Sequence, residues 1–271
     1  MKQLIIIIAI IFPFLSQAQL ADSTKRLVPM QGALNFRDAG GYTTQDGKRV
    51  VWGKVFRSAD ISKLTDADLQ LMAGKHIYTV FDFRGVKESA AAPDRLLPGT
   101  QYTLCSAGSD SMPDMKQIAM LVKQGGFLEA FYGTKSLPYY GDRYKPLFQK
   151  LLTLPDTAAI LYHCTGGRDR TGMASALFLY ALGVPEATIE ADFTASNIYL
   201  QPMHARMYQG MSQGMGLDMA TVKKEMDLRP ELLHIFFGAI RNKYGSIEKF
   251  MEQELGVGKK ELALLKKKYT M

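Results

Sequence analysis

The hydrophobic and polar residues of this chain follow two patterns that alternate along it. A run rich in β-branched and aromatic residues at residues 76–83 is typical of a buried strand, and a short apolar strand is expected at residues 158–162. Residues 55–57 are expected to continue the second strand of a hairpin. Longer stretches with helical character lie at residues 113–124 and 173–182. Strands that alternate with helices predict an α/β fold, with a largely parallel central sheet flanked by helices.

Turn and cap residues indicate where some of these elements begin. Thr65 is a predicted helix N-cap because Asp68 follows three positions later, which is the spacing of a capping box. Pro146 is expected to open another helix, because proline is favoured in the first helical turn and an apolar face follows it. An Asp-Gly pair at residues 46–47 predicts a hairpin turn.

The first residues form a segment that we expect to be removed. Lys2 gives it a positive start, residues 4–15 are almost wholly apolar, and a cleavage site follows Ala18. The apolar run is shorter than the ~20 residues of a membrane-spanning helix. We therefore predict a signal peptide over residues 1–18, with an uncleaved anchor as the alternative. Residues 19–271 are expected to form a single domain that is exported, periplasmic or secreted, with no stable membrane insertion after cleavage.

Composition and charge narrow the class of partner only slightly. The chain has 271 residues, of which 47% are hydrophobic and 22% charged, and this is ordinary for a globular protein with one large core. A net charge of +7 suits anionic partners. Basic patches interleaved with aromatic residues are absent from the sequence, so no nucleic-acid partner is expected.

The strongest chemical signal is the sequence HCTGGRDRTG at residues 163–172, which lies between a predicted strand and a predicted helix. A turn of this kind, rich in glycine, lets successive N–H groups converge on an anion. Cysteines at helix N-termini beside cations have pKa values of roughly 3.5–7.5, so a thiolate is expected at Cys164. Arg170 can bind two phosphate oxygens at once, which a lysine cannot do. The segment therefore predicts a phosphate cup with a sulfur nucleophile and an arginine.

The remaining residues of the motif have expected roles around that cup. His163 is expected to orient the loop through hydrogen bonds to nearby backbone, and Thr171 to donate its hydroxyl to the sulfur. Transfer to sulfur also needs an acid for the leaving oxygen and then a base for water. Asp169, in the loop, is the favoured candidate, although it could instead pair with an arginine. Asp82, at the end of a predicted strand, is the other candidate, or else it holds the loop through a buried hydrogen-bonded pair.

The chain has two cysteines, and their pairing is open at this stage. A disulfide is the default in an exported protein, but Cys164 must stay reduced to act. Cys105 is therefore interpreted as a buried apolar residue, with reversible oxidation that protects Cys164 as the alternative.

At these residues the chain resembles the cysteine-dependent protein tyrosine phosphatase superfamily. It is most similar to the bacterial tyrosine/serine phosphatases, whose loop reads HCxxGKDRTG. The segment NFRDAGGY at residues 35–42 resembles that family's NFRDLGG motif, and residues 56–58, 82–84 with Glu88, and 244–246 match further landmarks. The resemblance covers the chain from Leu34 to its C-terminus.

The resemblance implies a phosphomonoesterase that acts on phosphotyrosine in proteins, with phosphoserine, phosphothreonine or phosphoinositides accepted by some members. It implies no cofactor and no metal. Cys164 would be the nucleophile, and the phosphate would lie against the loop residues Thr165, Gly166, Gly167, Arg168, Asp169 and Arg170.

Several positions leave alternatives open. Arg168 replaces the family's usual lysine, which keeps the charge and changes its shape. Arg37, Asp38 and Arg57 either brace the loop or form structural salt bridges. Two segments are candidates for a lid, at residues 106–141 and 203–226, and a Met-rich core stripe is the other interpretation of the second. Two competing hypotheses for the whole chain are a non-catalytic phosphate-binding module and a rhodanese-type sulfurtransferase.

Overall fold

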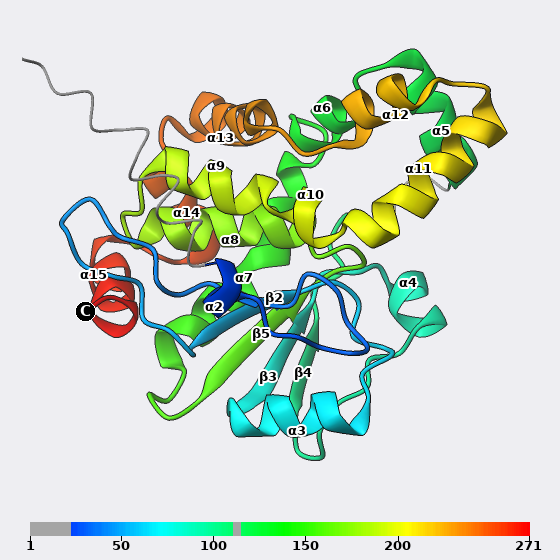
Figure 1. Cartoon of the computed structure of the whole chain (residues 1–271). Coiled ribbons are helices and arrows are strands. Elements are labelled where there is room, and N and C mark those ends of the chain that lie inside the picture. The colour runs from blue at the N-terminus through cyan, green and yellow to red at the C-terminus, as the bar shows by residue number, and fades with distance from the viewer. Residues whose placement is uncertain (1–22, 111–114) are drawn as a thin grey trace, which may run out of the picture.

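A five-stranded sheet lies at the centre of the fold, and helices cover both of its faces (Figure 1). The computed structural model describes residues 23–110 and 115–271, so the predicted signal peptide lies outside the described residues. The strands are β1 (Arg37–Asp38), β2 (Val55–Ser58), β3 (Ile77–Asp82), β4 (Gln101–Leu104) and β5 (Ala159–His163).

The strand order β1-β2-β5-β3-β4 places β5 in the middle of the sheet. β5 runs parallel to both of its neighbours, β3 pairs with β4 in the same sense, and only the edge strand β1 is antiparallel. His163 pairs with Ser58 on one side and with Asp82 on the other, so all three strands end at the same edge. This confirms the predicted α/β fold and places the end of β5 where open α/β sheets bind ligands.

Helices of different lengths lie before, between and after the strands. The early helices are α2 (Ser23–Arg26), α3 (Asp66–Gly74), α4 (Val86–Ala91), α5 (Met115–Gln124), α6 (Phe127–Tyr132), the 3-10 turn η1 (Leu137–Tyr139) and α7 (Tyr140–Thr153). After β5 come α8 (Arg170–Ala181), α9 (Glu186–Thr194), α10 (Ser196–Tyr199), α11 (Gln201–Met215), α12 (Met219–Met226), α13 (Pro230–Tyr244), α14 (Ile247–Leu255) and α15 (Lys259–Tyr269). No helix within residues 23–110 or 115–271 combines the length and apolar character that spanning a bilayer requires.

Side chains of β5 alternate between two hydrophobic cores, one on each face of the sheet. Ile160 and Tyr162 belong to the larger core, which includes residues of α7, α8, α13 and α14. Ala159 and Leu161 belong to the smaller core, which α3 covers with Met72. Every residue of β5 is buried, and this explains why the strand reads as an uninterrupted apolar run in the sequence.

Most boundaries agree with the sequence patterns, and one does not. The capping box is confirmed, because Thr65 accepts from the Asp68 amide at the start of α3. The expectation that Pro146 opens a helix is wrong, since α7 begins six residues earlier at Tyr140. Proline removes only one intrahelical hydrogen bond. The first turns of α7 bury Tyr140 and Tyr144 completely, and this packing stabilises the helix on both sides of the proline.

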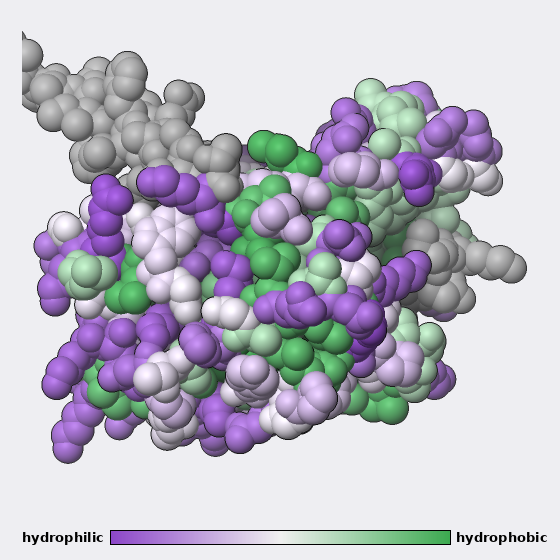
Figure 2. Space-filling model, turned by 60° about the horizontal axis from the view of Figure 1, so that its bottom comes forward, coloured by the Kyte–Doolittle hydropathy of each residue, from purple (hydrophilic) through white to green (hydrophobic). Residues whose placement is uncertain are grey.

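Two segments far apart in the sequence pack together into what we call the cap, defined as α5, α6, α11 and α12. α5 contacts α6, α11 and α12, and α12 also contacts α6. The cap extends to one side above the carboxyl edge of the sheet (Figure 1). Figure 2 shows the surface recessed between the cap and the rest of the molecule, with hydrophobic side chains in the recess. Both segments proposed as a lid therefore contribute to one structure.

Candidate active site

The loop of the predicted phosphate cup joins the end of β5 at His163 to the start of α8 at Arg170. Cys164, which is 2% exposed, lines a cavity of about 510 Å³ between this loop and the cap. Gly167 has a φ of +61°, and a Cβ at this position would lie 2.2 Å from the carbonyl oxygen of Ser58. Glycine is therefore required here both by the backbone conformation and by the close approach of β2.

The carbonyl groups of the loop are held on the side away from the cavity. The side-chain amide of Asn35 donates to the carbonyl oxygens of Gly166 (3.2 Å) and Gly167 (3.0 Å), and Arg57 also donates to Gly167 at 2.8 Å. In a planar trans peptide the N–H group points opposite to the carbonyl group. Binding the two carbonyls outward therefore turns the amides of Gly167 and Arg168 inward, as an anion cup requires.

Arg57 and Arg37 belong to a buried ionic cluster behind the loop. The Asp192 carboxylate pairs with Arg57 Nη1 at 2.7 Å and with Arg37 Nε at 3.1 Å, and it accepts from the Tyr42 hydroxyl at 2.8 Å. Burial alone would raise the pKa of Asp192, but the two guanidinium groups hold it well below its usual value. Arg37 and Arg57 thus form structural ion pairs with Asp192. Arg57 also braces the loop directly, because it donates to the carbonyl oxygen of Gly167.

Two other supporting residues do not make the contacts that the sequence suggested. The Asp38 carboxylate accepts from the backbone amides of Gly40 (2.7 Å) and Gly53 (2.6 Å), so it stabilises a turn and does not brace the loop. The hydroxyl of Thr171 has no hydrogen-bond partner among the residues that the structure describes, so the expected bond to sulfur is not formed.

Arg170, the arginine that is expected to bind phosphate, is held in place by Glu88, at the start of α4. Arg170 donates from Nη1 to Oε2 of Glu88 at 2.6 Å and from Nη2 to Oε1 at 3.1 Å. Burial acts to raise the pKa of Glu88, but Arg170 lowers it to about 2. Thr165 donates to the same carboxylate at 2.6 Å. The pairing uses the edge of the guanidinium formed by its two terminal nitrogens, so the edge that carries Nε can face a phosphate.

Cys164 and Arg170 also interact electrostatically. Burial opposes the positive charge of the guanidinium, whereas the charges of Cys164 and Glu88 raise the pKa of Arg170 above its ordinary value. Cys164, Arg170 and the loop residues Gly166 and Arg168 all line the same cavity.

Asp169 lines the same cavity, and two donors hold its carboxylate. Arg168 donates from Nε to Oδ2 at 2.9 Å, and Tyr132 donates its hydroxyl to Oδ1 at 2.9 Å. Tyr132 is completely buried on α6 and packs against Phe131 and Phe193, so its hydroxyl is fixed. The predicted pairing of Asp169 with an arginine is present, and the carboxylate still faces the cavity.

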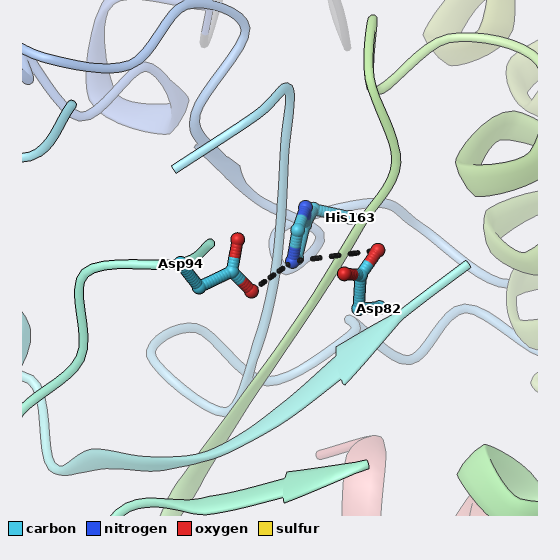
Figure 3. A group of neighbouring side chains, drawn as sticks. All are labelled: Asp82, Asp94 and His163. Carbon is cyan, nitrogen blue, oxygen red and sulfur yellow. Dashed lines mark hydrogen bonds and ion pairs between the residues drawn. The ribbon is translucent and has the colours of Figure 1, made fainter. Parts of the chain in front are cut away.

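Asp82 lies elsewhere, in a buried cluster with Asp94 and His163 (Figure 3). Arg84 donates to Asp82 at 2.8 Å and to Asp94 at 2.6 Å, so one guanidinium binds both carboxylates of this cluster. Burial acts to raise the pKa of Asp82, but the hydrogen bonds from Arg84 act against it, and the pKa lies below its ordinary value. The Asp82 side chain does not line the cavity. This geometry contradicts a role as the acid and fits the alternative of a buried pair that supports the loop.

The same cluster corrects the role of His163. Its Nε2 bonds to the Asp94 carboxylate at 2.8 Å, whereas hydrogen bonds to nearby backbone were expected (Figure 3). His163 is completely buried, and its neighbour in sequence is Cys164, the expected nucleophile. Because Arg84 also binds Asp94, the ionic cluster anchors the end of β5 from which Cys164 extends.

A sequence profile described as that of the tyrosine phosphatase family matches residues 28–271. The chain belongs to the tyrosine phosphatase family. It is a phosphatase of the hydrolase class, and the cavity over Cys164 is its candidate active site.

Three curated proteins are similar to this phosphatase over most of its length. A candidate tyrosine-protein phosphatase of Cupriavidus necator is 30% identical over 235 residues, which is 82% of each chain. A tyrosine-protein phosphatase of Nostoc commune is 29% identical, covering 78% of this chain and 72% of its own. The triple specificity protein phosphatase PtpB of Mycobacterium tuberculosis is 27% identical, covering 70% of this chain and 76% of its own.

The second cysteine of the phosphatase cannot reach the first. Cys105 follows β4 and Cys164 follows β5, and these strands lie on opposite sides of β3. Two strand spacings give about 9–10 Å, beyond the ~7 Å between Cα atoms that a disulfide allows. Burial, with a smaller contribution from Asp82, raises the pKa of Cys105 to about 12. Both cysteines are free, and Cys105 fits the interpretation of a buried apolar residue.

Several residues of the site were not predicted from the sequence. Glu88 was noted only as a landmark, and Asp192, Tyr132 and His204 were not singled out. His204, on α11, lies 3.4 Å from Nη1 of Arg168, and burial together with Arg168 lowers its pKa to about 4. The neutral imidazole therefore accepts from Arg168, whose planar group also donates to Asp169. The planar guanidinium of Arg168 has donors that point in different directions, so it can contact Asp169 and His204 at the same time.

Proposed function

We propose that this phosphatase hydrolyses phosphotyrosine in proteins through a phosphocysteine intermediate. The observation that carries the proposal is the position of Cys164 at the bottom of the cavity, beside Arg170 and below the inward-turned amides of the loop. Phosphoserine and phosphothreonine are possible further substrates, and a phosphoinositide with the same mechanism is the alternative. A non-catalytic module or a sulfurtransferase is disfavoured by membership of a phosphatase family.

In the first step the sulfur of Cys164 attacks phosphorus in line with the ester oxygen. The S–P bond forms as the P–O bond breaks, and the leaving oxygen takes a proton from the carboxyl group of Asp169. Arg170 and the loop amides bind the three equatorial oxygens, where charge is spread in the transition state. Arg168 and Tyr132 position Asp169 for this transfer through their two hydrogen bonds.

In the second step water attacks the phosphorus of the phosphocysteine. The Asp169 carboxylate now takes a proton from that water, the P–S bond breaks, and the sulfur leaves as a thiolate while inorganic phosphate is released. The same carboxylate therefore serves as acid and then as base. Arg170, which interacts electrostatically with Cys164, remains beside the sulfur as it leaves.

The shape of the cavity favours an aromatic phosphate ester. Cys164 lies below walls that include Phe127, Leu128 and Phe131 from α6 and Met207 from α11, and both helices belong to the cap. Apolar and aromatic walls bury the ring of a phosphotyrosine, and the ring is long enough to carry the phosphate to the cup. The names of the three relatives, which are tyrosine or triple specificity phosphatases, also support this substrate class.

We also propose that the phosphatase is exported. The support is the positive Lys2, the apolar run at residues 4–15 and the small residues before the cleavage site at Ala18. Phosphorylated proteins outside the cytoplasm would then be its partners.

A substrate panel tests the proposed function. We expect the protein without its first 18 residues to hydrolyse p-nitrophenyl phosphate and phosphotyrosine peptides equally well with and without EDTA, because no step needs a metal. Phosphotyrosine peptides should exceed matched phosphoserine peptides and soluble phosphoinositides in kcat/KM. Hydrolysis that stops on chelation would contradict the mechanism, and a preference for phosphoinositides would select the alternative substrate.

A further inference from the structure

A second hollow continues outward from the active-site cavity, and we call it the rim groove. It has a volume of about 530 Å³ and is lined by Leu34, Pro202, Met203, Arg206 and Met207. Met203 and Met207 line both the cavity and the groove, since they lie one turn apart on α11. The apolar surface is therefore continuous from the wall above Cys164 to the outside of the protein.

The rim groove has a fixed position relative to the phosphate cup. Leu34 precedes Asn35, whose side chain holds the carbonyl groups of Gly166 and Gly167. The carbonyl oxygen of Leu34 accepts from the backbone amide of Ala59 at 3.1 Å, which ties this segment to the end of β2. One wall of the groove is thus connected to the loop of the phosphate cup. The groove therefore lies at a fixed position relative to a substrate whose phosphate is bound in the cup.

The chemistry of the groove is that of a site for an apolar group. Four of its five lining residues are apolar, and Leu34 is 40% exposed although it adjoins the buried braces of the loop. A single exposed leucine is ordinary, but an exposed leucine that adjoins an apolar cavity wall extends the apolar surface of that wall. Among the described residues that line the groove, Arg206 is the one that carries a charge, and it can bind a backbone carbonyl of a peptide.

We propose that the rim groove is a specificity subsite for a large apolar side chain next to the phosphotyrosine in the substrate. This inference rests on the proposed function. The ring that carries the phosphate occupies the cavity above Cys164, so the group that reaches beyond Met203 and Met207 belongs to a neighbouring residue. Consecutive Cα atoms are 3.8 Å apart, which brings the next side chains within reach of a groove that shares a wall with the cavity.

The experiment compares phosphotyrosine peptides that differ in one flanking residue. In a panel with leucine or serine at each of the two positions on either side, we expect leucine at one position to raise kcat/KM about fivefold to tenfold, from partial burial of its side chain. Leu34→Ser should reduce that ratio to about twofold or less. Hydrolysis of p-nitrophenyl phosphate, which has no flanking residue, should not change in this variant.

Leu264→Ser is the matched control, because Leu264 lies on α15 and is 41% exposed, close to the value for Leu34. It should retain the full preference for leucine. The subsite is contradicted if the wild-type protein shows no flanking preference, or if both variants keep it equally. A preference for long-chain over short-chain lipid phosphates in place of any peptide preference also overturns it. Loss of p-nitrophenyl phosphate hydrolysis by the wild-type protein would instead overturn the proposed function.

Discussion

Cys164→Ser should abolish hydrolysis of p-nitrophenyl phosphate and of phosphotyrosine peptides, with kcat lower by at least about 10⁴-fold. A serine hydroxyl is not ionised at neutral pH, so the atom that must attack phosphorus is no longer a nucleophile. The cup should persist, because Asn35, Arg57 and Glu88 hold the loop and Arg170 without using the sulfur. We therefore expect the variant to bind phosphotyrosine peptide without turning it over, as measured by calorimetry beside the steady-state assay.

Cys105→Ser is the natural control, because it changes the second cysteine in the same way. Cys105 is buried beside β3 and does not line the cavity, so kcat per folded molecule should stay within about twofold of the wild-type value, as for a residue outside the site. Activity that persisted in Cys164→Ser, or that was lost with Cys105 alone, would contradict the assignment of the nucleophile.

Asp169→Asn should lower kcat for a phosphotyrosine peptide by about 10²–10⁴-fold, which is the usual contribution of a positioned acid. The amide cannot donate the proton that the leaving oxygen needs, and it cannot accept one from water in the second step. The loss should be smaller for p-nitrophenyl phosphate, because its leaving group departs readily without protonation. The alkaline limb of the pH–rate profile, which reports deprotonation of the acid, should disappear.

Asp82→Asn separates a catalytic role from a structural one. The change breaks the buried bonds to Arg84 and should lower the free energy of unfolding by about 3–5 kcal/mol, as for a broken buried ion pair. The alkaline limb should remain in the folded fraction. If that limb vanished in Asp82→Asn and remained in Asp169→Asn, the roles assigned to the two carboxylates would be reversed.

The sequence predicted the parts of this protein that are governed by local patterns. A run rich in β-branched and aromatic residues located β3, and an uninterrupted apolar run located β5, whose residues are all buried. The loop at residues 163–172 located the cup, because glycine at position 167 and an arginine at the start of α8 are required within a few residues of the cysteine. These features depend on neighbours in sequence.

Features that depend on distant residues were out of reach. Arg57 and Asp192 are 135 positions apart, and nothing in either local sequence shows that they share a buried ion pair. Tyr132 and Asp169 meet only because α6 packs over the loop, across 37 positions. β4 was not predicted as a strand. Its side chains are half-exposed at the edge of the sheet, where apolar and polar residues alternate only weakly along a strand.

Transfer of the phosphoryl group to the sulfur of Cys164 is tested most directly by trapping the phosphocysteine. Mixing the protein with a fast phosphate ester and quenching in acid within milliseconds should leave one phosphate on the peptide that contains Cys164, identified by mass spectrometry. More of this adduct should accumulate in Asp169→Asn, because its hydrolysis is slowed. Phosphate found on any other side chain, or turnover with no adduct on Cys164 in either protein, would contradict the account.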